Sequence, residues 1–258
     1  MLLKINAFKS KKNKSKIVCL TAYSKNIAQI IDKHTDLILV GDSLGSVLYN
    51  FKSTRSVTLD MMIKHSKSAR QGISKSLMVV DMPFNTYNNP TQALKNCKKV
   101  MKLTKCDGVK LEGGLKIIKI VKLLVKNKIP VMGHLGIMPQ FTKGKFKSKG
   151  KSVKEKKEII RDSKLLEDAG AFSIVLECVE KNLAKEISNS ISIPTIGIGS
   201  SHNCDGQILV TDDILGLTDS KIKFVKRFIN IKKVITSGVK KFKKEVKSKK
   251  YPTKKYSY

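Results

Sequence analysis

Tryptophan is absent from the 258-residue sequence, and cysteine, proline and acidic residues are scarce. No apolar run approaches the roughly 20 residues of a membrane-spanning helix, and the first residues lack the apolar stretch of a signal peptide. The five cysteines form no CxxC pair, so neither a disulfide framework nor a zinc site is indicated. We therefore expect a globular protein of the cytoplasm, with reduced thiols and no membrane contact.

Because acidic residues are few, the chain carries a large positive charge. It has 52 Lys and Arg residues against 20 Asp and Glu, which gives a formal net charge of +32. Such a charge favours polyanion binding, but only four of the basic residues are arginine, the residue that reads base edges and holds phosphates bidentately. The lysines are spread along the whole chain. We interpret them as a solvated surface and expect no specific nucleic-acid partner.

Eight short apolar runs are separated by amphipathic segments with helical spacing. The runs span residues 16–23, 37–42, 77–83, 108–113, 131–136, 173–178, 195–200 and 206–210. Strand and helix alternating eight times predicts a (β/α)8 TIM barrel, and an open doubly wound sheet is the alternative. We expect one domain over residues 1–258, with a lysine-rich C-terminal extension from about residue 240.

Polar residues interrupt these runs near their C-terminal ends, which is where the active site of a (β/α)8 barrel is built. They are Asp42 and Ser43 at the end of the second run, Asp81 in the third, Lys110 and Glu112 in the fourth, His134 in the fifth and Glu177 in the sixth. Lys110 and Glu112 are two residues apart, so both project into the barrel interior. Burying so many ionisable groups is costly unless they pair or hold a metal.

Three of these carboxylates, Asp42, Asp81 and Glu112, come from consecutive strands and can converge on one point. Oxygen ligands without cysteine favour a hard cation, and Mg²⁺ is the expected one. The alternative is that each carboxylate caps a loop or a helix N-terminus.

The other ionisable residues suggest acid–base chemistry on an anion. Glu177 stands where an apolar residue is expected, which favours a raised pKa and a general acid/base role. Lys110 would hold an anionic substrate, or else form a structural salt bridge with Glu112. His134 taken alone is interpreted as a core histidine.

Eight segments, in order and in spacing, resemble the ketopantoate hydroxymethyltransferase family. They are TAY (21–23), LVGDSLGS (39–46), VVDMPF (79–84), VKLEGG (109–114), GHLGIMPQ (133–140), VLECV (175–179), IGIGS (196–200) and DGQILV (205–210). The resemblance implies Mg²⁺-dependent transfer of a hydroxymethyl group from 5,10-methylenetetrahydrofolate to 3-methyl-2-oxobutanoate. The product would be 2-dehydropantoate (ketopantoate), on the route to pantothenate and coenzyme A. It also implies a cytoplasmic homo-oligomer, a decamer in bacterial members.

The resemblance assigns a role to each polar residue. It implies metal positions at Asp42, Asp81 and Glu112, keto-acid positions at Asp42, Ser43, Asp81 and Lys110, a proton acceptor at Glu177 and a supporting contact at His134. The sequence departs from the family pattern at Ser24 (usually Asp), at Arg55 and Ser56 (usually Leu-Pro) and at Phe146 (usually Tyr). These departures concern loop closure and turnover rather than the type of reaction.

Two other functions are compatible with the same barrel. A carbon–carbon lyase of the isocitrate-lyase type would share the fold and Mg²⁺, but it would need a reactive cysteine in a Lys-Lys-Cys-Gly-His segment, which this sequence does not contain. A binding protein on a decayed barrel is the other alternative. Retention of every catalytic position that the resemblance implies argues against it.

Overall fold

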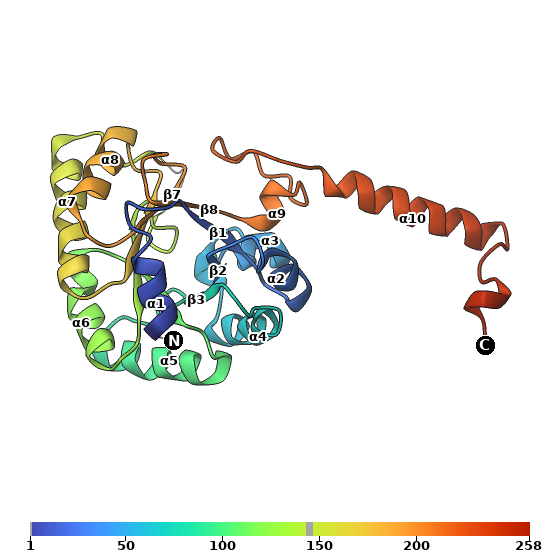
Figure 1. The fold of residues 1–258 in the computed structure, drawn as a ribbon, viewed down its shortest axis with the longest axis horizontal. Coiled ribbons are helices and arrows are strands. Elements are labelled where there is room, and N and C mark those ends of the chain that lie inside the picture. The colour runs from blue at the N-terminus through green and yellow to red at the C-terminus, as the bar shows by residue number, and fades with distance from the viewer. Residues whose placement is uncertain (1, 143–146) are drawn as a thin grey trace. The chain divides into compact units, whose positions relative to one another are not determined.

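The computed structural model describes residues 2–142 and 147–258, so the departure at Phe146 lies outside the described residues. Eight parallel strands pair in chain order, and β8 pairs with β1, which closes a barrel (Figure 1). The strands are β1 (Ile17–Thr21), β2 (Leu37–Val40), β3 (Leu77–Asp81), β4 (Gly108–Glu112), β5 (Val131–Gly136), β6 (Ser173–Glu177), β7 (Thr195–Ile198) and β8 (Gly206–Leu209). The eight predicted strands and the (β/α)8 fold class are confirmed.

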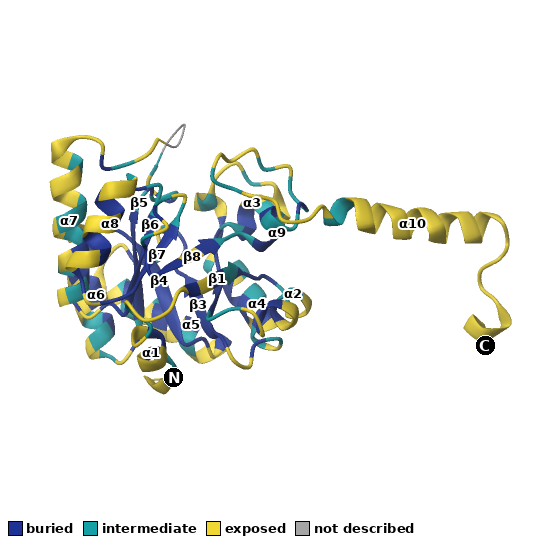
Figure 2. Ribbon diagram, turned by 45° about the horizontal axis from the view of Figure 1, so that its top comes forward, coloured by how far each residue is buried: buried dark blue, intermediate teal, exposed yellow. Residues whose placement is uncertain are grey.

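Helices surround this barrel, with their inner faces buried and their outer faces exposed (Figure 2). They are α1 (Leu2–Lys9), α2 (Lys25–Ile31), α3 (Leu44–Tyr49), η1 (Thr54–Ser56), α4 (Leu59–Arg70), α5 (Pro90–Thr104), η2 (Leu115–Ile117), α6 (Ile118–Lys126), α7 (Val153–Asp168) and α8 (Lys181–Ser190). Side-chain caps fix where several of them begin. The side chains of Thr58, Asn89 and Ser152 accept hydrogen bonds from backbone N–H groups in the first turns of α4, α5 and α7. Residues 199–205, all of them described, contain no helix, so the predicted alternation is interrupted between β7 and β8.

Alternation along the strands sorts side chains between the barrel interior and the helix layer. On β3, Leu77 and Val79 belong to the cluster of buried apolar side chains that fills the barrel, here called the interior cluster. Met78 and Val80 instead pack with the helices. The other strand residues of the interior cluster are Ile17, Cys19, Leu37, Leu39, Met132, Val175, Ile196 and Ile208. The next inward position on β3 is Asp81, so the same alternation that builds the core also turns this carboxylate inward.

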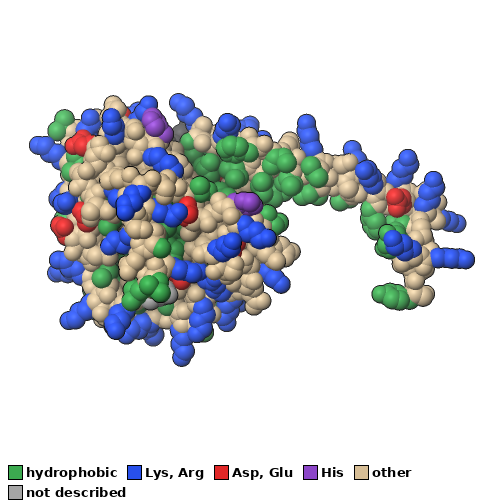
Figure 3. All heavy atoms as spheres, in the orientation of Figure 1, with side chains coloured by type: hydrophobic (Ala, Val, Ile, Leu, Met, Phe, Trp, Pro, Cys, Tyr) green, Lys and Arg blue, Asp and Glu red, His purple; other side chains and the backbone are tan. Residues whose placement is uncertain are grey.

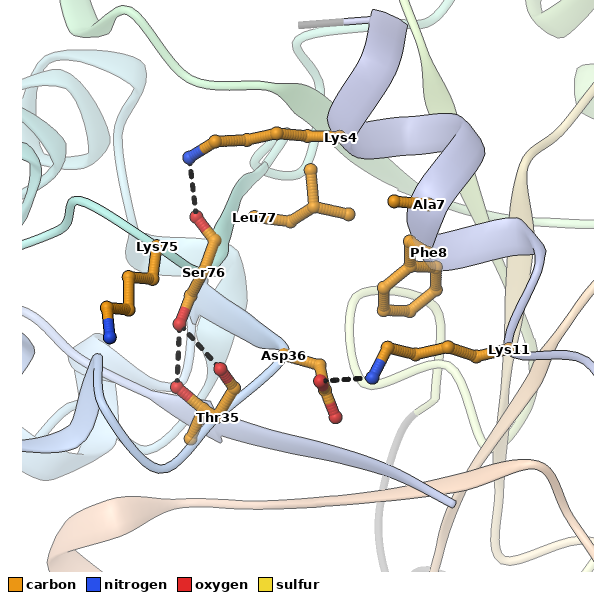
Figure 4. A pocket seen from close by; sticks show the side chains of 9 residues that line it. All are labelled: Lys4, Ala7, Phe8, Lys11, Thr35, Asp36, Lys75, Ser76 and Leu77. Atoms are coloured by element: carbon orange, nitrogen blue, oxygen red, sulfur yellow. Dashed lines mark hydrogen bonds and ion pairs between the residues drawn. The ribbon is translucent and has the colours of Figure 1, made fainter. Parts of the chain in front are cut away.

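Helix α1 covers the N-terminal end of the barrel. Ile5 and Phe8 are buried in the interior cluster, and the Phe8 ring meets that of Phe172 edge-on at 5.8 Å between centroids. A cavity of about 230 Å³ lies between α1 and the segments that lead into β2 and β3, and Lys4 at its rim donates to the Ser76 carbonyl at 3.4 Å (Figure 4). This cavity is at the opposite end of the strands from the predicted catalytic residues, and we do not assign the active site to it.

The chain divides into two compact units, residues 1–210 and residues 211–258. The first contains all eight strands of the barrel, and the second contains α9 (Thr211–Ile214), α10 (Ile231–Lys247) and η3 (Lys254–Tyr256). Helix α10 has no buried residue, and its exposed apolar side chains recur at helical spacing: Val234, Ile235, Val239, Phe242 and Val246. The predicted start of the extension, at about residue 240, falls within α10. The predicted domain limits stay a prediction.

Within the described part of the chain, no helix combines the length and the apolar character needed to cross a membrane. Lysine and arginine side chains are spread over the face seen in Figure 3 rather than gathered in one patch. This distribution agrees with the interpretation of the lysines as a solvated surface.

Candidate active site

The C-terminal ends of β3 to β6 bring the predicted polar residues together on inward-facing positions. The register pairs Asp81 with Lys110, and Glu112 with His134. Glu177 follows at the end of β6, two residues after the interior residue of that strand. A layer of ionisable side chains therefore lies directly above the apolar core of the barrel.

Asp42 and Asp81 meet at the ends of β2 and β3. The backbone N–H of Asp42 donates to Oδ2 of Asp81 at 3.1 Å, and both side chains are buried. Burial, followed by the negative charge of Asp81, raises the pKa of Asp42 to about 7. Two ionised carboxylates here repel each other, and a cation would relieve that repulsion.

Lys110 supplies part of this positive charge. Its Nζ lies 3.2 Å from Oδ1 of Asp81, so Lys110 forms its ion pair with Asp81 rather than with Glu112. Burial acts to lower the pKa of Lys110, but the negative charges of Asp81, Glu112 and Asp42 outweigh burial and raise it above its ordinary value. Lys110 is therefore a buried cation at neutral pH.

His134 links Lys110 to Glu177. Lys110 Nζ lies 3.0 Å from His134 Nδ1, and an ammonium can only donate, so Nδ1 accepts and the ring proton is assigned to Nε2. Nε2 lies 3.2 Å from Oε2 of Glu177, a close polar contact that does not meet the geometry of a hydrogen bond. Burial and the charge of Lys110 lower the pKa of His134, so the ring is neutral.

Gln140 connects the carboxylates, and sequence reasoning missed it. Its Nε2 donates to Oδ2 of Asp42 at 2.8 Å and to the Met82 carbonyl at 2.9 Å, while its backbone N–H donates to Oε2 of Glu112 at 3.0 Å. Tyr87, also missed, donates its hydroxyl proton to Oε1 of Gln140 at 2.6 Å. The sequence feature that could have identified Gln140 as a site residue is its position as the last, polar residue of the segment GHLGIMPQ.

The loop after β5 delivers Gln140 to the site because of a glycine. Gly136 has φ of +95°, and a Cβ at this position would lie only 2.1 Å from the Glu177 carbonyl oxygen. That same carbonyl accepts the Ile137 N–H at 2.8 Å, which fixes the turn. A side chain at position 136 would therefore displace both the loop and the end of β6.

The remaining predicted residues lie around this buried cluster. Ser43 precedes α3, and its Oγ is 2.8 Å from the Tyr23 hydroxyl. Of the departures from the family pattern, Ser24 precedes α2, and Arg55 lies on η1 with its side chain exposed. These two departures lie outside the carboxylate cluster.

The donor set fits a divalent cation in type and charge, although the described residues contain no three His, Cys, Asp or Glu side chains already arranged around one point. Oδ1 of Asp81 is buried without a hydrogen bond, having only its ion pair to Lys110. Burial raises the pKa of Glu112 well above its ordinary value, and the charge of Asp42 adds to this. Three crowded carboxylates against one lysine leave negative charge that a hard cation would neutralise.

Fold and site together define a class: a (β/α)8-barrel protein whose C-terminal mouth carries buried carboxylates, a lysine cation and a glutamate next to a neutral histidine. Solved structures share the fold. A phosphonopyruvate hydrolase complex with oxalate and Mg²⁺ aligns with a TM-score of 0.63 at 9% identity, over 98% of this chain and 93% of that one. A 2,3-dimethylmalate lyase aligns with a TM-score of 0.59 at 11% identity, over 99% and 92%. At such identities the likeness concerns the fold alone.

The chain belongs to the ketopantoate hydroxymethyltransferase family, whose sequence profile matches residues 3–254. A relative from Pelagibacter ubique named 3-methyl-2-oxobutanoate hydroxymethyltransferase is 66% identical over 99% of both chains. A relative of the same name from Anaplasma marginale is 47% identical, over 100% of this chain and 94% of its own. The resemblance predicted from eight short segments is confirmed.

Proposed function

We propose that this protein transfers a hydroxymethyl group from 5,10-methylenetetrahydrofolate to 3-methyl-2-oxobutanoate and forms ketopantoate. The observation that carries the proposal is the continuous contact from Asp81 through Lys110 and His134 to Glu177. It sets a cation for the oxygens of a 2-oxo acid beside a carboxylate that can accept a proton. Family membership supports the same reaction.

In the proposed reaction the C3–H bond of the keto acid breaks, C3 bonds to the methylene carbon, and water supplies the hydroxyl oxygen as tetrahydrofolate leaves. Glu177 accepts the C3 proton. Lys110 attracts the substrate's oxygens and, being charged, stabilises the negative charge that develops there. His134 orients Glu177 through the Nε2 proton, and Ser43 donates to the substrate. Burial of this layer strengthens each of these interactions.

We also propose that Asp42, Asp81 and Glu112 hold Mg²⁺. Their carboxylate oxygens are of the type that Mg²⁺ prefers, and the raised pKa values of Asp42 and Glu112 mark charge that an ion would balance. When bound, Mg²⁺ would supply positive charge at the keto oxygen as the C3 proton leaves. The role of Gln140 is then to hold Asp42 and Glu112 in place.

The location and assembly stay predictions: a cytoplasmic homo-oligomer, of ten subunits by resemblance to bacterial members. The exposed apolar side chains of α10 support association, because such a face is costly in water. Sedimentation of the full chain measures the number of subunits.

The test of the proposed function is a product assay. The purified chain, incubated with 3-methyl-2-oxobutanoate, 5,10-methylenetetrahydrofolate and Mg²⁺, should form a product heavier by one CH₂O unit, and EDTA should abolish it. A family relative assayed in parallel controls for the reagents. If the relative forms product and this chain only binds the keto acid, the chain is a binding protein on a barrel scaffold and the proposal is wrong.

A further inference from the structure

Three side chains outside the carboxylate cluster form a cation–aromatic group, which we call the Arg55–Phe84–Phe141 cluster. The guanidinium carbon of Arg55 lies 4.0 Å from the centroid of the Phe84 ring. The rings of Phe84 and Phe141 meet edge to face, with centroids 5.7 Å apart and planes at 72°. Phe141 is 52% exposed and Arg55 is exposed, so the group presents an aromatic ring and a positive charge to solvent.

The cluster is tied to the active site by Gln140. Phe141 is the next residue in the chain, and Phe84 lies two residues beyond Met82, whose carbonyl accepts from the Gln140 side chain at 2.9 Å. The same side chain donates to Asp42 at 2.8 Å. One buried amide therefore fixes both aromatic loops and contacts a predicted metal ligand. The two rings lie at the mouth of the barrel beside the buried site.

Both aromatic loops are held in defined turns. The Thr86 hydroxyl donates to the Pro83 carbonyl at 2.6 Å, next to Phe84. The backbone N–H of Phe141 donates to the Met138 carbonyl at 2.9 Å. The exposed ring is therefore presented from a hydrogen-bonded turn, where a ligand's ring can stack on it.

The Arg55 guanidinium is free to bind an anion. Among residues 2–142 and 147–258 it has no ion pair and no side-chain hydrogen bond, and it stacks on the ring of Phe84. A guanidinium that lies on a ring keeps the N–H groups at its edge for a carboxylate. A ligand that offers a flat ring system and a carboxylate together would satisfy both the exposed ring and the unpaired cation.

We infer that the Arg55–Phe84–Phe141 cluster is the subsite for the one-carbon carrier, with the carrier's aromatic part stacked against Phe141 and its glutamyl carboxylates on Arg55. This inference rests on the proposed function. The small keto acid occupies the buried polar layer, so the carrier has to approach from the mouth with its methylene carbon directed inward. The inference also gives Arg55, where the family usually has leucine, a specific role. Its guanidinium binds the carboxylates of the carrier's tail.

The test compares Phe141→Ala and Arg55→Leu with two matched controls, Leu115→Ala for an exposed apolar side chain and Lys52→Leu for an exposed charge. We expect the KM for 5,10-methylenetetrahydrofolate to rise about tenfold in Phe141→Ala and about fivefold in Arg55→Leu. The KM for 3-methyl-2-oxobutanoate, the melting temperature and both control variants should stay unchanged. Phe141→Leu replaces Phe141→Ala if the latter fails to fold.

Two further measurements separate this inference from the proposed function. With a carrier analogue in which both glutamyl carboxylates of 5,10-methylenetetrahydrofolate are neutral amides, the Arg55→Leu penalty should vanish while that of Phe141→Ala remains. Exchange of the C3 hydrogen of the keto acid in D₂O needs no carrier, so both variants should exchange at the wild-type rate. Carrier KM values within about twofold of wild type in both variants, with product still formed, overturn the subsite alone. Absence of both exchange and product in the wild type overturns the proposed function, and the subsite with it.

Discussion

Lys110 Nζ lies 3.0 Å from Nδ1 of His134, and this contact fixes the proton of the histidine on the nitrogen that faces Glu177. The chemistry of Glu177 therefore depends on a lysine two strands away in the barrel. Because the pKa of His134 is lowered by burial and by Lys110, the ring orients Glu177 without itself gaining a charge at neutral pH.

Replacing His134 with asparagine or with glutamine distinguishes the roles of its two ring nitrogens. The longer Gln can place an amide donor near the Nε2 position and keep the contact with Glu177, whereas Asn can only replace Nδ1. We expect His134→Asn to lower kcat about 10²-fold and His134→Gln to lower it several-fold less, with a shifted acid limb in the pH–rate profile of His134→Asn. Equal losses in the two variants, with unchanged pH profiles, would show that His134 acts only by packing.

Mg²⁺ should stabilise the protein more at high pH than at low pH. The pKa of Asp42 is raised from 3.8 to about 7, so without the ion the ionisation of Asp42 lowers folded-state stability as pH rises from about 4 through about 7. Above that range the ionised ligand is available to the cation. The Mg²⁺-induced rise in melting temperature should therefore be larger at about pH 8 than at about pH 5.5. Asp81→Asn should abolish it, and a rise that persists in this variant contradicts the metal assignment.

Tyr87→Phe should destabilise the protein through Gln140. The substitution removes the hydroxyl that donates at 2.6 Å and leaves Oε1 of a buried amide unsatisfied, which costs about 1–3 kcal/mol. Tyr49→Phe is the matched control, because Tyr49 is exposed, its hydroxyl lies 2.9 Å from Nε2 of half-buried His65, and the loss of this bond should cost under about 0.5 kcal/mol. Urea unfolding measures both, and equal free energies of unfolding in the two variants would refute the structural role of Tyr87.

Asp32→Asn tests the packing of α2 against the segment that leads into β3. Burial acts to raise the pKa of Asp32, but hydrogen bonds from Ser76, Ser74 and Lys75 outweigh it and hold the pKa below its ordinary value. The ionised form therefore stabilises the fold above about pH 4, and this contribution is lost as pH falls further. We expect a loss of about 2 kcal/mol in the variant near pH 7, shrinking toward pH 3. A loss that does not change with pH would contradict this.

The sequence predicted the barrel and the position of most of the site because both follow from the alternation of side chains along strands. Lys110 and Glu112 share a face by their spacing alone, and Asp81 follows Leu77 and Val79 by the same rule. Such local rules need no knowledge of loops. The sequence offered Glu112 as the ionic partner of Lys110, whereas the structure pairs Lys110 with Asp81. Asp81 is on the neighbouring strand, and the register between strands decides this contact.

The contacts that sequence reasoning missed depend on loops. Gln140 reaches Asp42 only because Gly136 turns the chain back over the barrel, and a glutamine in a loop has no periodicity that marks it as buried. Tyr87 likewise contacts Gln140 across 53 positions of sequence. The missing helix between β7 and β8 has a similar origin, because the seven residues of 199–205 are too few to form a crossover helix.

The most direct test of the central claim is the rate at which the C3 hydrogen of 3-methyl-2-oxobutanoate exchanges in D₂O, without carrier, in the wild type and in Glu177→Gln. The amide preserves shape but cannot accept the proton, so exchange should slow by about 10²–10⁴-fold while keto-acid affinity and melting temperature change little. Glu186→Gln, which alters an exposed glutamate on α8, should exchange at the wild-type rate. Exchange in Glu177→Gln within about threefold of the wild type would contradict the account and remove Glu177 from the catalytic residues.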